Sequence, residues 1–89
     1  MAEKKSSKGA TLAGLSLVGA GLAHFVAPQV FEPITKPAFP RDTARHIKTN
    51  GTIETALGAG LLIPQTRKLA VLGALGYVAY LGVNAAKNR

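Results

Sequence analysis

The charged residues of this chain are confined to short clusters that separate long uncharged runs. Residues 9–31 and 69–86 contain no Lys, Arg, Asp or Glu, and residues 49–66 contain only Glu54. A protein that binds nucleic acid spreads its basic residues along one face. Here the basic residues border apolar runs, as they do beside membrane-spanning helices. The net charge of +7 therefore indicates a membrane surface, and no nucleic-acid partner is expected.

The lengths of these runs predict an all-α fold. A helix needs roughly 20 apolar residues to cross a bilayer. We therefore predict an integral membrane bundle of three transmembrane helices, at about 9–27, 43–63 and 67–86. A basic tail over 1–8 precedes this single domain of residues 9–89. The first run begins like a signal peptide, but we expect it to be a helix of the mature protein. A small soluble helical bundle is the alternative.

The segment between the first two helices contains Pro28, Pro33, Pro37 and Pro40. Because proline lacks a backbone N–H and restricts its neighbours, this density predicts a loop without regular structure over 28–41. Asp42 is a residue type that favours the N-cap of a helix, so the second helix is expected to start at Thr43.

Small residues recur every four positions on the predicted helices, a spacing that lets membrane helices approach closely. The positions selected on this basis are Gly14, Ala56, Gly60 and Gly82. They could pack the three helices on one another or on another subunit, and the sequence leaves both interpretations open.

One polar cluster is expected inside the bundle. Up-down-up connectivity brings the end of the first helix, the start of the second and the end of the third to one side. The cluster comprises His24, Glu54, Tyr77, Tyr80 and Asn84. A lone carboxylate in the apolar zone is costly, so Glu54 must be paired or protonated. His24 is the best partner, with Tyr80 or Asn84 as hydrogen-bond donors. The cluster either holds the helices in register or forms a proton or quinone site.

No cofactor is expected within the chain itself, although a quinone could bind at an interface. Haem between His24 and His46 is not expected, because three helices enclose too little of it. The chain has no cysteine, and no metal site or catalytic residue is predicted.

Several separated motifs are similar to those of the DoxX-like family of small bacterial membrane proteins. They are "HFVAPQVFEPITKPAFP", "NGTIETALGAGLLIPQTRKLAVLG" and the late Asn84. The matching positions are His24, Phe25, Pro28, Gly51, Glu54, Leu61, Leu62, Pro64, Thr66 and Arg67. Members of that family usually have four helices, so this chain resembles a shortened, three-helix member. The resemblance implies a link to quinone-dependent oxidoreductases. It also implies a location in the bacterial inner membrane, with the N-terminus on the cytoplasmic side.

Together these features predict a small accessory or anchoring subunit of a larger bacterial membrane complex, such as a respiratory or quinone-linked oxidoreductase. No catalytic activity is expected of the chain alone. The alternatives are a direct contribution to a quinone or proton site and a small oligomeric transporter or channel. The expected partners are other membrane subunits and anionic lipids, which would be contacted by Lys4, Lys5, Lys8, Arg67 and Lys68.

Overall fold

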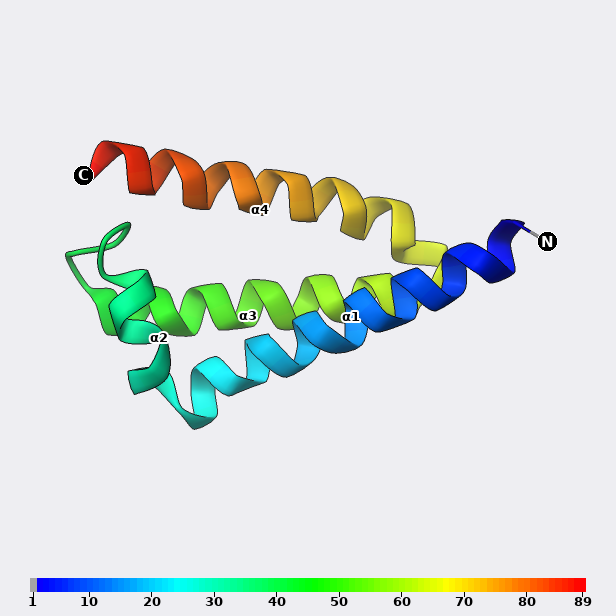
Figure 1. The fold of residues 1–89 in the computed structure, drawn as a ribbon, viewed down its shortest axis with the longest axis horizontal. Helices are drawn as coiled ribbons and strands as arrows, with labels where there is room; N and C mark the ends of the chain where they lie inside the picture. The colour runs from blue at the N-terminus through cyan, green and yellow to red at the C-terminus, as the bar shows by residue number, and fades with distance from the viewer. Residues whose placement is uncertain (1) are drawn as a thin grey trace.

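The computed structural model describes residues 2–89, with side chains from residue 8 onward, and within this part every regular element is helical. The elements are α1 (Ala2–Val26), α2 (Pro28–Thr35), α3 (Thr43–Leu62), the 3-10 turn η1 (Pro64–Thr66) and α4 (Arg67–Lys87). Figure 1 shows α1, α3 and α4 running alongside one another, with α2 at the end where α1 finishes and α3 starts. The N-terminus and C-terminus lie at opposite ends of this bundle. The all-α prediction is confirmed.

The predicted loop over 28–41 was wrong for its first half, where α2 makes two turns of helix. Pro28 occupies the first turn of α2, where its missing N–H would have no helical partner and its fixed φ suits the helix. Pro33 lies inside the helix and removes only one hydrogen bond, while Pro37 and Pro40 follow the end of α2. The positions of the prolines, rather than their density, therefore decide the local structure.

The start of α3 is where the sequence predicted it, but Asp42 does not cap it as expected. Asp42 has a left-handed backbone with φ 54°, and its side chain makes no capping hydrogen bond. Aspartate tolerates this conformation better than most residues. The Thr43 hydroxyl instead donates to the Phe39 carbonyl at 2.6 Å, which closes the turn that leads into the helix.

The turn between α3 and α4 compensates for a missing backbone donor. Pro64 has no N–H to offer the Gly60 carbonyl four residues earlier. The Thr66 hydroxyl donates to that carbonyl at 2.8 Å, and Arg67 Nε donates to the Leu61 carbonyl at 2.8 Å. These two side chains complete the end of α3 and start α4 in the reverse direction.

Helices α1 and α3 make the most extensive contact of the bundle, and glycines determine how close they come. A Cβ added at Gly14 would lie 2.8 Å from the Gly58 carbonyl oxygen, and one at Gly58 would lie 2.6 Å from the Gly14 oxygen. Gly21 and Gly51 form a second reciprocal pair, at 2.6 and 2.8 Å. The two antiparallel backbones therefore touch at two levels, with no room for a side chain between them.

The positions selected from four-residue spacing divide into two groups. Gly14 of α1 packs against α3, as described above, and a Cβ at Gly60 would lie 2.9 Å from the Ala70 Cβ of α4. Ala56 is exposed, and a Cβ at Gly82 would meet nothing within 4 Å. Neither of the latter packs within the chain, so their contact with another subunit stays a prediction.

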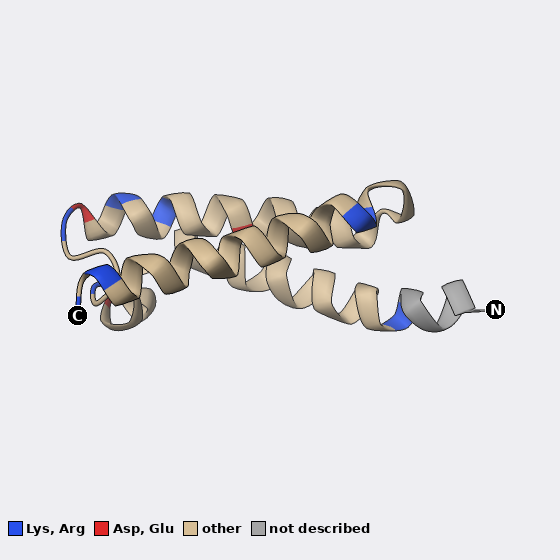
Figure 2. Ribbon diagram, turned by 90° about the horizontal axis from the view of Figure 1, so that it is seen from above, with Lys and Arg blue, Asp and Glu red and all other residues tan. Residues whose placement is uncertain are grey.

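Much of the apolar surface has no cover within the chain. Among residues 8–89, the buried hydrophobic residues are only Ala38, Phe39, Ile47, Leu61 and Ala70. Among the described residues, two helical segments are long and apolar enough to cross a membrane, Lys8–Val26 and Pro64–Lys87. Figure 2 shows that Lys and Arg gather toward the two ends of the bundle. Since α3 carries Arg45, Lys48 and Glu54, it does not share this apolar character.

Substitution of Gly21 tests the close contact of α1 and α3. In Gly21→Ala the new methyl group would meet the Gly51 carbonyl oxygen at 2.6 Å, so the helices must separate. Overpacking of this kind costs about 1–3 kcal/mol, and thermal unfolding followed by circular dichroism in detergent should show the loss. Gly19→Ala is the matched control, because a Cβ there meets nothing within 4 Å. Equal melting of the two variants would contradict the contact.

Candidate functional site

A cavity of about 370 Å³ lies at the α2 end of the bundle. Every helix contributes to its wall, because the end of α1, the start of α3 and the second half of α4 meet there, with α2 and the following loop alongside. Its lining residues are His24, Phe31, Ile34, Thr35, Ala38, Phe39, Asn50, Glu54, Tyr77, Leu81 and Ala85. A polar site therefore forms within an otherwise apolar bundle.

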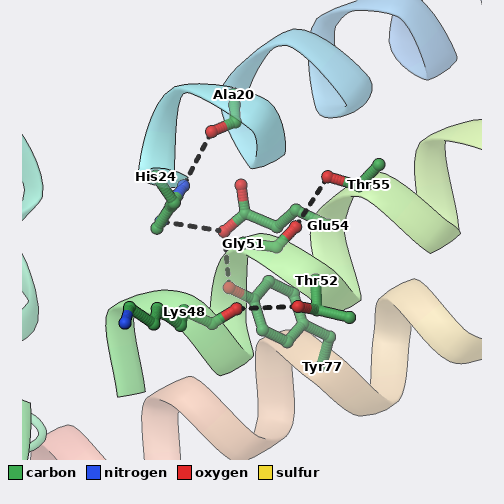
Figure 3. A network of polar contacts seen from close by, with 8 residues as sticks. All are labelled: Ala20, His24, Lys48, Gly51, Thr52, Glu54, Thr55 and Tyr77. Atoms are coloured by element: carbon green, nitrogen blue, oxygen red, sulfur yellow. Dashed lines mark hydrogen bonds and ion pairs between the residues drawn. The ribbon is translucent and has the colours of Figure 1, made fainter. Parts of the chain in front are cut away.

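Glu54 is the centre of the polar contacts in this cavity (Figure 3). The Tyr77 hydroxyl of α4 donates to Glu54 Oε2 at 2.5 Å. His24 Nε2 of α1 lies 3.8 Å from the same oxygen. The carboxylate of α3 is thus approached from both neighbouring helices, and the Tyr77 hydroxyl supplies the hydrogen-bond donor that a carboxylate in an apolar zone needs.

The orientation of His24 follows from its other contacts. Its Nδ1 lies 2.7 Å from the Ala20 carbonyl oxygen, and because a carbonyl only accepts, Nδ1 carries the hydrogen. The ring stacks on Phe31 of α2 with centroids 3.7 Å apart. A Cβ at residue 51 would lie 2.5 Å from the His24 Cβ, so Gly51 provides the space for this side chain. The remaining nitrogen, Nε2, is turned toward Glu54.

Two residues of the predicted cluster lie elsewhere. Tyr80 contacts the ring of Phe39, with centroids 5.4 Å apart, and makes no described hydrogen bond to Glu54. Asn84 donates to the Tyr80 carbonyl at 2.8 Å and lines a smaller cavity beside His46. The structure brings together His24, Glu54 and Tyr77, and the expectation that Tyr80 or Asn84 would donate to Glu54 was wrong.

The predicted cluster left out Asn50, one turn before Glu54 on α3. Only 3% of Asn50 is exposed, and its Oδ1 accepts no hydrogen bond within the described residues. Thr35 was missed as well, because its segment was expected to be a loop. A signal for Asn50 existed, since residues four apart share a helix face and Glu54 was already suspected.

The two histidines belong to separate sites. His24 stacks on Phe31 and lines the large cavity, whereas His46 stacks on Phe39 with centroids 4.4 Å apart and lines the smaller one. Each ring has its own aromatic partner and lines its own cavity. Among the described residues no group of three His, Cys, Asp or Glu could hold a metal ion.

The His24, Glu54 and Tyr77 side chains are three groups that can each gain or lose a proton. Tyr77 and Glu54 are in hydrogen-bond contact, whereas His24 Nε2 lies 3.8 Å from Glu54 Oε2, which is beyond hydrogen-bond distance. The direct hydrogen-bond path is therefore limited to Tyr77 and Glu54. The geometry alone supports either a structural tie or proton transfer to a bound molecule.

Comparison with known sequences places the protein in a family. Residues 12–87 match the family described as Domain of unknown function (DUF8561). The chain belongs to that family. Comparison with curated proteins and with solved structures finds no match. The DUF8561 match covers the apolar segment Pro64–Lys87, most of the segment Lys8–Val26 and all the residues that line the cavity.

Removal of the Tyr77 hydroxyl tests its bond to Glu54. In Tyr77→Phe the carboxylate loses its closest donor, and leaving a buried acceptor without its partner costs about 1–3 kcal/mol. Thermal unfolding in detergent should record this loss. Tyr80→Phe removes a hydroxyl with no described hydrogen bond and should change stability by less than about 0.5 kcal/mol. If the two variants melt alike, the Glu54–Tyr77 bond does not stabilise the bundle.

Proposed function

We propose that this protein is a small integral membrane subunit that supports or anchors a larger bacterial membrane complex. The observation that carries the proposal is the exposure of α4. Leu69, Leu72 and Val78 are 70%, 64% and 65% exposed, although they lie on different sides of the helix. Only Ala70 is buried on α4. A helix this apolar and this uncovered marks a surface for lipid or for a protein partner, and the proposal assigns it to both.

The same proposal includes α3 as a third crossing. It has 20 residues and follows α1 closely in the opposite direction, so a membrane that holds α1 would surround α3 as well. Arg45 and Lys48 lie in its first two turns, where they would reach the headgroup layer. The N-terminus is proposed to lie on the cytoplasmic side of the bacterial inner membrane, by analogy with the DoxX-like family.

Anionic lipid is proposed as a second kind of contact. Lys8 and Lys68 are exposed and lie at the same end of the bundle, as the α3–α4 turn and the N-terminal end of α1 do in Figure 1. Arg67 is partly engaged with the Leu61 carbonyl, so it contributes less. The proposed contacts of Lys4 and Lys5 lie outside the residues whose side chains are described.

The DoxX-like resemblance supports a respiratory or quinone-linked oxidoreductase as the host complex. Two of the residues on which the resemblance rests, His24 and Glu54, line the cavity. An accessory subunit of this kind would have no catalytic activity of its own.

Cross-linking tests the accessory role. A leucine-sized photoreactive residue at Leu75, which is 64% exposed on α4, should form an adduct with a different polypeptide in native membranes. The same residue at the buried Leu61 should react only within the chain. Adducts from Leu75 with lipid or with second copies alone would contradict the proposal. Membranes are washed with alkaline carbonate first, and release of the chain by that wash would contradict the membrane location.

A direct quinone or proton site is the second candidate function, favoured by the cavity that His24, Glu54 and Tyr77 line. If Glu54 moves protons for a quinone, Glu54→Gln should lower quinone turnover of the host complex about a hundredfold, as expected for loss of a general acid or base. The subunit composition should stay unchanged on native gels. Full turnover in an assembled Glu54→Gln complex would leave only the structural role for Glu54.

A further inference from the structure

We propose that the cavity at the α2 end binds a neutral, lipid-soluble aromatic alcohol, whose hydroxyl donates a hydrogen bond to Asn50 or Glu54. The proposal concerns the chain by itself. It needs neither a partner subunit nor electron transfer, so it goes beyond the accessory role.

The cavity wall contains hydrogen-bond acceptors that no described donor reaches. Asn50 is almost fully buried, and its Oδ1 has no partner within the described residues. The Tyr77 hydrogen is already directed to Oε2 of Glu54, and no described donor reaches the second oxygen of Glu54. The Nδ1 hydrogen of His24 is likewise directed to the Ala20 carbonyl. A molecule that brings a donor hydrogen satisfies an acceptor that the described residues leave unpaired.

The rest of the cavity wall is apolar and largely aromatic. The rings of Phe31, Phe39 and Tyr77 line the cavity together with the His24 ring. Stacking on such rings favours a flat aromatic body. A volume of about 370 Å³ is near the lower end of ligand sites, which run from about 300 to 1,000 Å³. One substituted ring fits this description better than a large ligand does.

The charged residues around the cavity oppose the binding of an ionic ligand. The same end of the bundle carries many basic residues, namely Lys36, Arg41, Arg45, Lys48, Lys87 and Arg89, whereas its acidic residues are Glu32, Asp42 and Glu54. This excess of positive charge repels an approaching cation, and an anion inside the cavity would face the Glu54 carboxylate. A neutral molecule avoids both costs. Ile34, which lines the cavity, is 71% exposed, so the wall is open on an apolar side from which a lipid-soluble molecule can enter.

A pair of probes that differ only in the donor hydrogen tests the proposal. The chain in lipid nanodiscs is titrated with para-trifluoromethylphenol or with its methyl ether, and fluorine NMR measures binding relative to empty nanodiscs. The phenol should bind about tenfold more tightly than the ether, which corresponds to about 1.4 kcal/mol. Equal affinity would overturn the proposal. So would tighter binding of benzyltrimethylammonium, or of a para-benzoquinone of similar size, which offers acceptors only.

Two asparagine variants place the probe. Asn50→Leu keeps a similar volume but removes the unpaired acceptor, and it should abolish most of the preference for phenol over ether. Asn84→Leu is the matched control, since Asn84 lies on α4 outside the large cavity and should leave the preference unchanged. An unchanged preference in folded Asn50→Leu would overturn the assignment of Asn50. Should Asn50→Leu not fold by circular dichroism, the comparison of phenol with ether on the unaltered chain still decides the proposal.

This experiment separates the inference from the accessory role. The binding measurement uses the isolated chain, whereas the accessory role depends on adducts formed by α4 in native membranes. Loss of the phenol preference with intact cross-linking would remove only the ligand site. Phenol binding without a protein adduct at Leu75 would remove only the accessory role.

Discussion

The close contact between the backbones of α1 and α3 is the constraint on which the remaining structure depends. The Gly14–Gly58 and Gly21–Gly51 pairs allow an approach that any side chain would prevent. Lipid gives no hydrophobic driving force for association between apolar helices, so close packing of this kind has to hold them together. The second pair has a further effect, because the space left by Gly51 is filled by the base of the His24 side chain. The contact that holds the helices therefore also delivers an imidazole to Glu54.

Helix α4 depends on a different kind of interaction. Its apolar contacts with α3 are few: Ala70 lies against Gly60, and Gly73 lies close to the Leu57 side chain. Its polar links are specific by comparison, since Tyr77 donates to Glu54 and Asn88 donates to the Ala38 carbonyl at 2.9 Å. Polar bonds of this kind set the rotation and height of a helix that packing alone would leave free to turn. The Glu54 carboxylate, a lone charge in an apolar run, thus links α3 to the middle of α4, as the Arg67–Leu61 hydrogen bond links their turn ends.

The sequence predicted the long helices well because hydropathy and charge are local properties. It failed where the answer depends on a pair of elements. The contact glycines lie seven residues, or two helical turns, apart on each helix. Which glycines of α1 meet which glycines of α3 depends on the register of the two antiparallel helices. Tyr77, Tyr80 and Asn84 share one stripe of α4, and only its rotation against α3 determines that Tyr77 reaches Glu54. The short helix α2 was missed for a local reason, because the prolines were weighed by number and not by position.

The two ends of the bundle differ because of what each turn must do. At the α3–α4 turn the chain reverses within a few residues, and Thr66 and Arg67 are used up in completing the end of α3. At the other end, α2 places Phe31 on His24 and buries Thr35, so the longer connection can enclose a space instead of only reversing direction. Polar side chains lie beside that space. At the short turn, the Thr66 and Arg67 side chains already donate to carbonyls of α3, so they are not available as partners for further buried polar groups. The cavity is therefore a consequence of the long connection, and α2 is the element that gives it a wall.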